Sequence, residues 1–179
     1  MTSYTYSGED DEGGIPDDTD SLIVAEAVQI LPINFCRHHI HLQQVVLPSS
    51  LGCIPGHAFQ GCEALREAMI PSTVTVIGDF AFSLCTSLTY VRFPEGLKTI
   101  GKNSFASCAF THLRIPGSLA VIEENAFTGC VSLVEVELID GLKMIGQDAF
   151  STCSSLRELR LPSTVEVIMG RTHLETASI

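Results

Sequence analysis

The sequence predicts a solenoid of short stacked coils, because four residue types return along the chain at a fixed step. The step is 23 residues, with one step of 22, and one complete unit occupies residues 71–93. A fixed period in this range is typical of proteins whose units are too small to bury their own apolar face and therefore stack on their neighbours. The recurring positions are Pro48, Pro71, Pro94, Pro116 and Pro162; Ile54, Ile77, Ile100, Ile122, Ile145 and Ile168; Phe59, Phe82, Phe105, Phe127 and Phe150; and Cys62, Cys85, Cys108, Cys130 and Cys153.

Two parts of each unit read as short strands. In residues 88–93 we expect Leu88, Val91 and Phe93 to point inward, and Pro94 then ends the strand because it has no N–H to donate to a neighbouring strand. Residues 74–77 are mainly β-branched and predict a second, shorter strand. The third part, residues 79–85, has apolar side chains at helical spacing and predicts a single helical turn. Stacking of these turns would line up the phenylalanines as an aromatic spine.

The ends of the chain depart from the repeat. Residues 1–20 hold seven acids and no base, and we expect a disordered acidic tail there. Residues 21–41 align with the next unit when shifted by 23 positions and predict a degenerate N-terminal capping coil. Regular repeats of 22–23 residues follow over 42–168, and residues 169–179 form a broken final repeat without the Phe and Cys. We therefore expect the spine to end uncovered at Phe150, and this end either to associate with a second copy or to belong to a longer array.

Charge limits the choice of partner and location. The net charge is -11, and after the first 20 residues 14 acids face 10 lysines and arginines. We expect neither nucleic acid nor a membrane as partner, because phosphate binding needs a net basic face. The first basic residue is Arg37, which is too late for a secretory signal, and no apolar run reaches about 18 residues. The expected location is the cytoplasm, with the extracellular surface as the runner-up.

The seven cysteines do not predict a disulfide framework. Five of them share one column, and stacked neighbours about 5 Å apart would be within reach of a bridge. Five is an odd number, however, and a chain without an export signal stays in a reducing compartment. We interpret the column as a ladder of buried thiols that act as small apolar residues.

A metal site is the alternative function of the segment 36–41, which reads Cys-Arg-His-His-Ile-His. Zinc needs three or four ligands that converge, whereas alternate side chains of an extended segment diverge. Although His39 and His41 could share a face, no second ligand pair lies at metal spacing elsewhere. We interpret the segment as a cap with surface histidines and expect no metal and no other cofactor.

Enzymatic motifs are absent or imitated by the repeat. Residues 96–103 read G-x-x-x-x-G-K-N, which matches a phosphate-binding loop except that Asn103 replaces the required hydroxyl. Because Leu97 and Ile100 occupy core columns of the repeat, we attribute this match to the repeat. None of the patterns H-E-x-x-H, G-x-S-x-G and C-x-x-C occurs. We expect no catalytic residues and no enzymatic activity.

The repeat unit resembles leucine-rich repeats of the bacterial surface antigen A type (BspA-like). Those repeats follow L-x-x-V/L-x-L-P-x-S-L/V-x-x-I-G-x-x-A-F-x-x-C, and residues 65–85 match nearly every fixed position. The resemblance covers 42–168 and implies a right-handed, curved coil with a parallel β-sheet that serves recognition and adhesion. Ile139 replaces the proline, Glu123 replaces the glycine, and one residue is missing after Cys108. These departures lie mainly in turns.

The candidate functional residues are those that point outward and differ from coil to coil. In two middle units these are Tyr90, Arg92, His112 and Arg114. Tyrosine and arginine are enriched at binding hot spots, which favours a patch that binds a protein or peptide partner, an acidic one included. The alternative is that these charges pair with cross-strand neighbours and contribute only about 0.2–1 kcal/mol per pair. We therefore expect a non-catalytic interaction module, with a surface adhesion or structural protein, or a fragment of a longer array, as alternatives.

Overall fold

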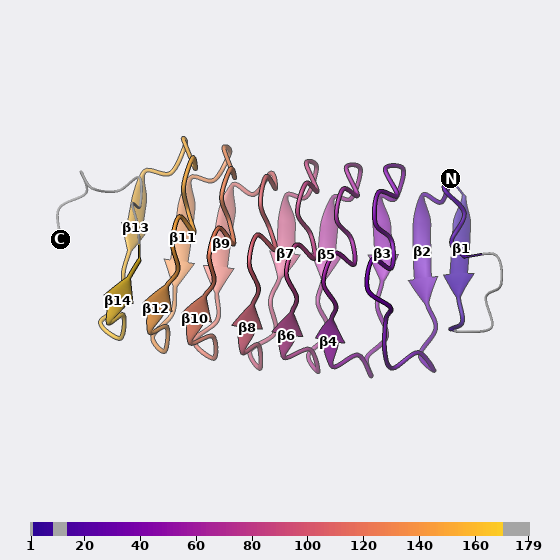
Figure 1. Cartoon of the computed structure of the whole chain (residues 1–179), viewed down its shortest axis with the longest axis horizontal. Coiled ribbons are helices and arrows are strands. Elements are labelled where there is room, and N and C mark those ends of the chain that lie inside the picture. Colours follow the sequence, from indigo (N-terminus) through magenta and orange to yellow (C-terminus); the bar gives the residue numbers. More distant parts are fainter. Residues whose placement is uncertain (1, 9–13, 170–179) are drawn as a thin grey trace.

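The protein is a solenoid of about six coils of parallel β-structure (Figure 1). The computed structural model describes residues 2–8 and 14–169. Within these ranges it has 14 strands in two rows and no helix. The first row contains β1 (Ser3–Tyr6), β2 (Ser21–Val24), β3 (Gln44–Val46), β5 (Glu67–Met69), β7 (Tyr90–Arg92), β9 (His112–Ile115), β11 (Glu135–Leu138) and β13 (Glu158–Arg160). The second row contains β4 (Cys53–Ile54), β6 (Val76–Ile77), β8 (Thr99–Ile100), β10 (Val121–Ile122), β12 (Met144–Ile145) and β14 (Val167–Ile168).

The predicted division of each unit into a longer and a shorter strand is confirmed. First-row strands alternate inward and outward side chains, so that Leu113 is buried between the exposed His112 and Arg114. The proline that follows β3, β5, β7, β9 and β13 starts a turn: the carbonyl of Pro94, for example, accepts the Leu97 N–H at 3.1 Å. Proline therefore both ends the strand and directs the chain into the next side of the coil.

The two rows differ in continuity. The six short strands of the second row form one hydrogen-bonded sheet, whereas the first row is divided between β3 and β5 and between β7 and β9. The second division coincides with the one 22-residue step. There the Ala109 N–H donates to the Leu88 carbonyl at 3.0 Å, and the register between β7 and β9 shifts after this bond. The deleted residue therefore interrupts the ladder and leaves the stack intact.

The prediction of a helical turn in residues 79–85 is wrong. Phe80 and Leu84 have left-handed backbones, with φ of 58° and 61°, which a right-handed helix does not allow. Alternate N–H groups also point in different directions: those of Phe80, Phe82 and Leu84 donate to carbonyls of the next coil, and those of Ala81, Ser83 and Cys85 close local turns. A helix would direct these groups along its own axis and leave the carbonyls of the adjoining coil without partners.

The predicted aromatic spine is confirmed. Phe59, Phe82, Phe105, Phe127 and Phe150 are buried, and successive rings stack with centroids 5.1–5.5 Å apart and planes 5–16° apart. Toward the N-terminus Phe35 meets Phe59 edge-on at 6.1 Å, and Tyr6 meets Phe35 at 4.8 Å. The spine thus continues beyond the regular repeat, although with a different ring geometry.

Burial of the cysteine column is confirmed, and all seven thiols are free. Each column thiol donates to a backbone carbonyl of the preceding coil, as Cys85 does to Phe59 at 3.1 Å. Burial raises the pKa of Cys62 and of Cys130 to about 12 and that of Cys153 to about 11. These thiols stay protonated and unreactive at neutral pH, because the thiolate is the nucleophilic form.

The prediction of a disordered tail over residues 1–20 is wrong for Ser3–Tyr6. These residues form β1, which pairs in parallel with β2 and lies at the end of the first row (Figure 1). Tyr4 and Tyr6 supply the reason, since both pack against the hydrophobic core. The Asp20 carboxylate accepts the Thr2 N–H at 2.7 Å, and this bond lowers the pKa of Asp20. The acids at positions 9–12 lie outside the described residues.

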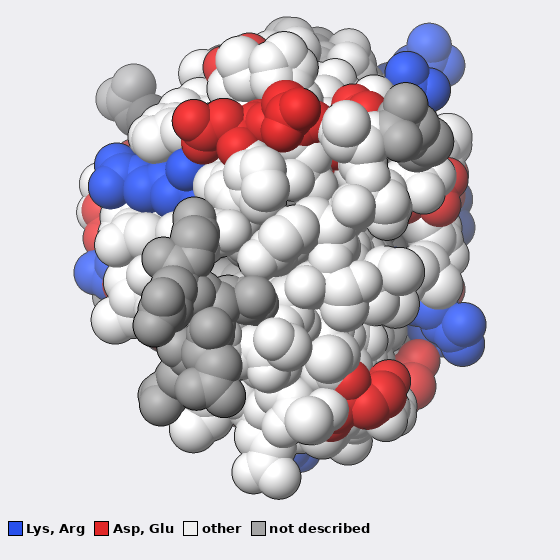
Figure 2. Space-filling view, turned by 90° about the vertical axis from the view of Figure 1, so that its right-hand side faces the viewer, with Lys and Arg blue, Asp and Glu red and all other residues white. Residues whose placement is uncertain are grey.

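The N-terminal end therefore has two layers. The predicted 23-residue alignment of residues 21–41 agrees with the pairing of β2 and β3, in which Ser21 faces Gln44 and Ile23 faces Val46. β1 then covers the outer edge of β2, so the coil of residues 21–41 is not the outermost element at this end. Seen from this end, most of the surface carries uncharged side chains, with acidic side chains gathered along a rim (Figure 2).

At the other end, the expectation that Phe150 is uncovered is wrong, since its side chain is 1% exposed. Leu156, Leu159 and Val165 of the last coil pack against the core that contains it. Exposed apolar side chains occur further out, at Leu161 and at 167–169. Residues 170–179 lie outside the described part of the chain.

Candidate functional site

Tyr90 and Arg92 lie on β7 and point away from the core, as the sequence predicts. The intervening Val91 packs inward against the core, which fixes the two flanking side chains on the outer face. Tyr90 is 50% exposed. In the register of β5 and β7, Glu67 lies beside Tyr90 and Met69 lies beside Arg92. Arg92 therefore has Met69 opposite it on β5 and Tyr90 two residues before it on the same strand face.

His112 and Arg114 occupy the equivalent positions on β9 and are held by glutamates. Arg114 lies 3.1 Å from Glu95 through Nη1 and 3.3 Å from Glu137 through Nε. His112 Nε2 lies 3.9 Å from a Glu135 carboxylate oxygen. Arg114 and His112 therefore lie beside glutamates of the neighbouring strand, as the alternative of cross-strand pairing predicts. Arg92 has no such pair.

Arg92 differs from its neighbours in having no electrostatic partner. Its side chain makes no ion pair or hydrogen bond with any residue of the ranges 2–8 and 14–169. The last outward arginine, Arg160, is bonded to Glu158 at 2.9 Å, and that bond lowers the pKa of the Glu158 carboxylate. Of the outward arginines at positions 92, 114 and 160, Arg92 is therefore the one without an acidic partner among the described residues.

The four candidate residues lie together in one open groove. The groove has a volume of about 1300 Å³ and extends along the outer face from β5 to β13. Its lining includes Tyr90, Arg92, His112 and Arg114, together with Glu95, Glu135, Glu137 and Glu158. Small-molecule sites are typically enclosed and mainly apolar, with volumes of about 300–1,000 Å³. A long open groove with mixed charge is better suited to an extended polymer chain.

Sequence reasoning missed the apolar part of this face. Ile23, Val46 and Met69 point outward from β2, β3 and β5 and are 41%, 56% and 49% exposed. Ile23 pairs with Val46, and Met69 pairs with Arg92, so the four side chains follow one row across the strands. The signal was present in the sequence, since these residues fill outward positions at the repeat spacing.

The segment 36–41, considered and rejected as a metal site from the sequence, does not bring its possible ligands together. Cys36 is buried in the core, and the Nε2 atom of His39 lies 3.1 Å from the Ile15 carbonyl, so these side chains do not converge. His39 is half-buried, which corrects its interpretation as a surface histidine. The described residues contain no group of three or more His, Cys, Asp or Glu side chains placed to hold a metal ion.

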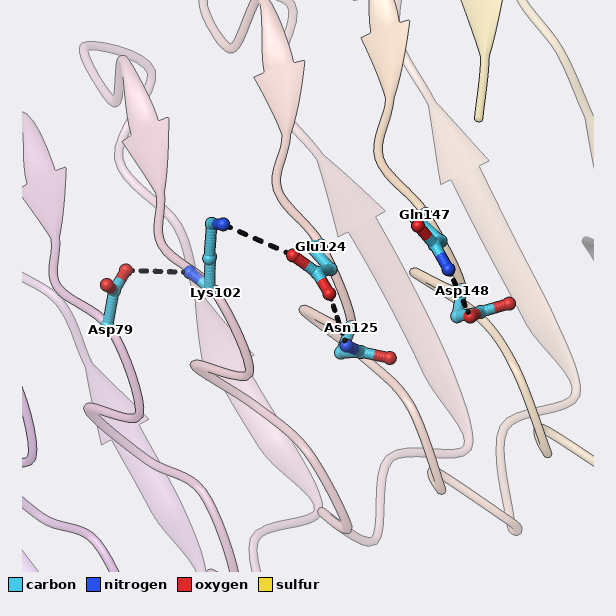
Figure 3. A network of polar contacts seen from close by, with 6 residues as sticks. All are labelled: Asp79, Lys102, Glu124, Asn125, Gln147 and Asp148. Atoms are coloured by element: carbon cyan, nitrogen blue, oxygen red, sulfur yellow. Dashed lines mark hydrogen bonds and ion pairs between the residues drawn. The ribbon is translucent and has the colours of Figure 1, made fainter. Parts of the chain in front are cut away.

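The loop that imitates a phosphate-binding pattern is surrounded by acids. The Lys102 N–H donates to Asp79 at 2.8 Å, and its ammonium group donates to Glu124 at 3.2 Å (Figure 3). The bond to Glu124 raises the pKa of Lys102. Leu97 and Ile100 are fully buried, as the repeat predicts. Carboxylates occupy the positions where phosphate oxygens would have to bind.

These features define the class of the protein as a leucine-rich-repeat solenoid, with one long strand, one short strand and a turn in each coil. The chain belongs to the family of BspA type leucine-rich repeat regions. The family model matches residues 29–79 and 52–176 in six copies. No helix of the described residues is long and apolar enough to cross a membrane.

Solved structures of similar fold come from bacterial leucine-rich repeat proteins. The protein from T. pallidum is 28% identical with a TM-score of 0.72, covering 78% of this chain and 66% of its own. The proteins from Eubacterium ventriosum and Bacteroides ovatus are each 24% identical, with TM-scores of 0.78 and 0.67. These two cover 87% and 85% of this chain, which spans only 43% and 45% of theirs. No curated protein matches the chain.

Proposed function

We propose that this chain is a non-catalytic interaction module that binds a protein or peptide partner on the outer face of its first row of strands. The observation that carries the proposal is Arg92, a cation without a partner, beside the half-exposed Tyr90 on a strand fixed by its neighbours. Arginine and tyrosine contribute strongly to binding hot spots because they combine large contact area with directional hydrogen bonds.

The charge of the face supports an acidic group on the partner. The guanidinium of Arg92 can donate two parallel hydrogen bonds to one carboxylate. Arg114 and Arg160 already have glutamate partners, so a carboxylate would have to displace these before binding there. The proposed contact set is therefore centred on Tyr90 and Arg92, with His112 and Arg114 at its border.

Affinity capture tests this function. The intact chain and an Arg92→Glu/Arg114→Glu variant are immobilised, exposed to an extract of the source cells, and compared by mass spectrometry. We expect proteins captured by the wild type to be lost with the double variant, whose circular dichroism stays unchanged because both side chains are exposed. Arg160→Glu is the matched control, because it reverses a charge on the same face at β13. Equal capture by all three chains would rule out the proposed patch.

An adhesive role at the cell surface is the second candidate, and membership of this repeat family favours it. Location distinguishes the two roles, and the cytoplasm remains the prediction from the sequence. Protease treatment of intact cells, followed by immunoblotting of this chain, would separate them. Digestion in intact cells supports adhesion, whereas protection until the cells are lysed supports an internal interaction module.

We also propose self-association through the last coil. Leu161, Val167 and Ile168 are between 42% and 45% exposed there, and strand edges with apolar side chains tend to pair with other chains. A second copy or further coils would each cover this surface.

A further inference from the structure

One outward row of side chains on the first row of strands is apolar over β2, β3 and β5 and charged from β7 onward. Ile23, Val46 and Met69 form a row across β2, β3 and β5, and each exposes about half of its side chain. β3 and β5 are joined where the Arg66 N–H donates to the Gln43 carbonyl at 3.3 Å, so the row is continuous in space. The adjoining outward row contains the uncharged Ser21 and Gln44 beside the first two of these residues, and the exposed Glu67 beside Met69.

The apolar row ends at a cation, and acids lie beyond it. Arg92 is the next member of the row after Met69. On the far side of Arg92, the face carries Arg114 and Arg160 paired with glutamates, together with Glu135 beside Glu158. A carboxylate placed on this face is therefore attracted to Arg92 and repelled further along. Charge complementarity gives any bound chain a fixed direction.

The spacing of the row fits an extended peptide. Neighbouring strands are about 4.8 Å apart, so the row from Ile23 to Arg92 measures about 14 Å. An extended peptide advances about 3.3 Å per residue and directs alternate side chains to one side, so residues i, i+2 and i+4 span about 13 Å. Two apolar side chains and one acidic side chain at these positions would meet the apolar row and then Arg92.

We infer that the partner is an extended peptide segment with the pattern apolar-x-apolar-x-Asp/Glu, lying across the strands with its acidic residue at Arg92. This inference rests on the proposed function, since it identifies the partner that the outer face binds. Ile23, Val46 and Met69 supply apolar contact, and Arg92 selects the acidic residue. Tyr90, which lies next to Arg92 on β7, packs against the peptide beside the acidic residue.

A peptide library of unbiased sequence tests the inference. Random dodecapeptides displayed on phage are selected on the immobilised full chain, and enriched peptides are synthesised for fluorescence-polarisation titration. We expect the apolar-x-apolar-x-Asp/Glu pattern to be enriched. Met69→Glu and Arg92→Gln should each weaken binding at least tenfold, and Arg160→Gln should change it less than twofold. The melting temperatures of the variants should match that of the wild type, since all three side chains are exposed.

Charge reversal gives the sharpest test. Arg92→Glu should reject the selected peptides and bind versions in which Lys replaces the acidic residue. This gain cannot result from misfolding. If selected peptides bind the outer face but depend on Arg114 and ignore Met69 and Arg92, the inference is overturned and the proposed function stands. If no library peptide binds, the inference is overturned, and the proposed function is decided by the capture experiment. If peptides bind but are insensitive to every substitution on this face, both are overturned.

Discussion

Phe80 lies flat on His57, with ring centroids 5.0 Å apart and planes 3° apart. Both residues have left-handed backbones, with φ of 58° and 59°, at a position where other coils carry Asn34, Asn103, Asn125 and Asp148. Asparagine tolerates this conformation, whereas bulky residues lose about 1–2 kcal/mol in it. The stack is therefore a compensating contact between two strained turns.

A double-mutant cycle measures that compensation. His57→Asn and Phe80→Asn each remove backbone strain together with the stack, so we expect each single variant to unfold within about 1 kcal/mol of the wild type. The cycle should give a favourable coupling of about 0.5–1.5 kcal/mol between the two rings in urea unfolding. A coupling of zero would show that the rings are neighbours without mutual stabilisation.

Ser104 predicts a stabilising substitution. Its hydroxyl is fully buried and has no hydrogen-bond partner among the described residues, and the equivalent residue in other coils is Ala58, Ala81 or Ala126. Because an unsatisfied buried hydroxyl costs about 1–3 kcal/mol, Ser104→Ala should raise the free energy of unfolding by about 1 kcal/mol or more. The mirror change, Ala81→Ser, should lower it by a similar amount. Equal urea midpoints for all three chains would contradict this account.

Gly101 is required by close approach of the coils. A Cβ atom there would lie 2.7 Å from the Asp79 amide nitrogen and 2.8 Å from the Gly78 carbonyl carbon. Gly101→Ala should therefore cost about 1–3 kcal/mol, measured by urea unfolding. Gly96 in the same coil is the control, since its nearest contact would be the Ser72 carbonyl oxygen at 3.7 Å, and Gly96→Ala should change stability by less than about 0.5 kcal/mol. Because the entropic effect of Gly→Ala on the unfolded chain is stabilising, similar losses at both positions would show that close approach of the coils at Gly101 is not the cause.

The buried thiols predict loss of stability in alkali. Burial raises the pKa of Cys153 to about 11 from its ordinary value of 9.0, so between these values the folded chain keeps a proton that the unfolded chain releases. Stability is therefore full below pH 9 and falls as pH rises toward 11, by up to about 1.4 kcal/mol per pH unit for this thiol. Cys153→Ala should flatten the dependence of the urea midpoint on pH. Cys53→Ser, which removes an exposed thiol, is the matched control variant.

Self-association is tested by light scattering during size-exclusion chromatography. If the last coil associates, the mass should rise with concentration, and Val167→Lys should return the chain to a monomer. Val131→Lys is the control, because Val131 is 55% exposed and lies away from that end. A monomer across a wide concentration range for the unmodified chain would contradict the proposal.

The positions that sequence reasoning predicted correctly are those determined by local chemistry and by the repeat. The inward columns, the prolines after the strands and the buried thiols each follow from residue type and spacing. The outward direction of Tyr90 and Arg92 followed in the same way, because side chains alternate along a strand. The helical turn of residues 79–85 did not, since apolar spacing alone cannot distinguish a helix from turns that hydrogen-bond to the next coil.

The length of the coil, its inward side chains and its family all follow from residue type and spacing. Contacts between side chains of neighbouring coils do not, because they depend on which residues the stacking brings together. It placed β1 over the first edge through Tyr4 and Tyr6, and it paired Arg114 with Glu95 and Glu137. Arg92 faces Met69 on β5 and forms no ion pair with any described residue, since the position directly opposite it holds a methionine where the position opposite Arg114 on β11 holds Glu137. The difference between two arginines at equivalent positions thus arises from their partners on adjacent coils.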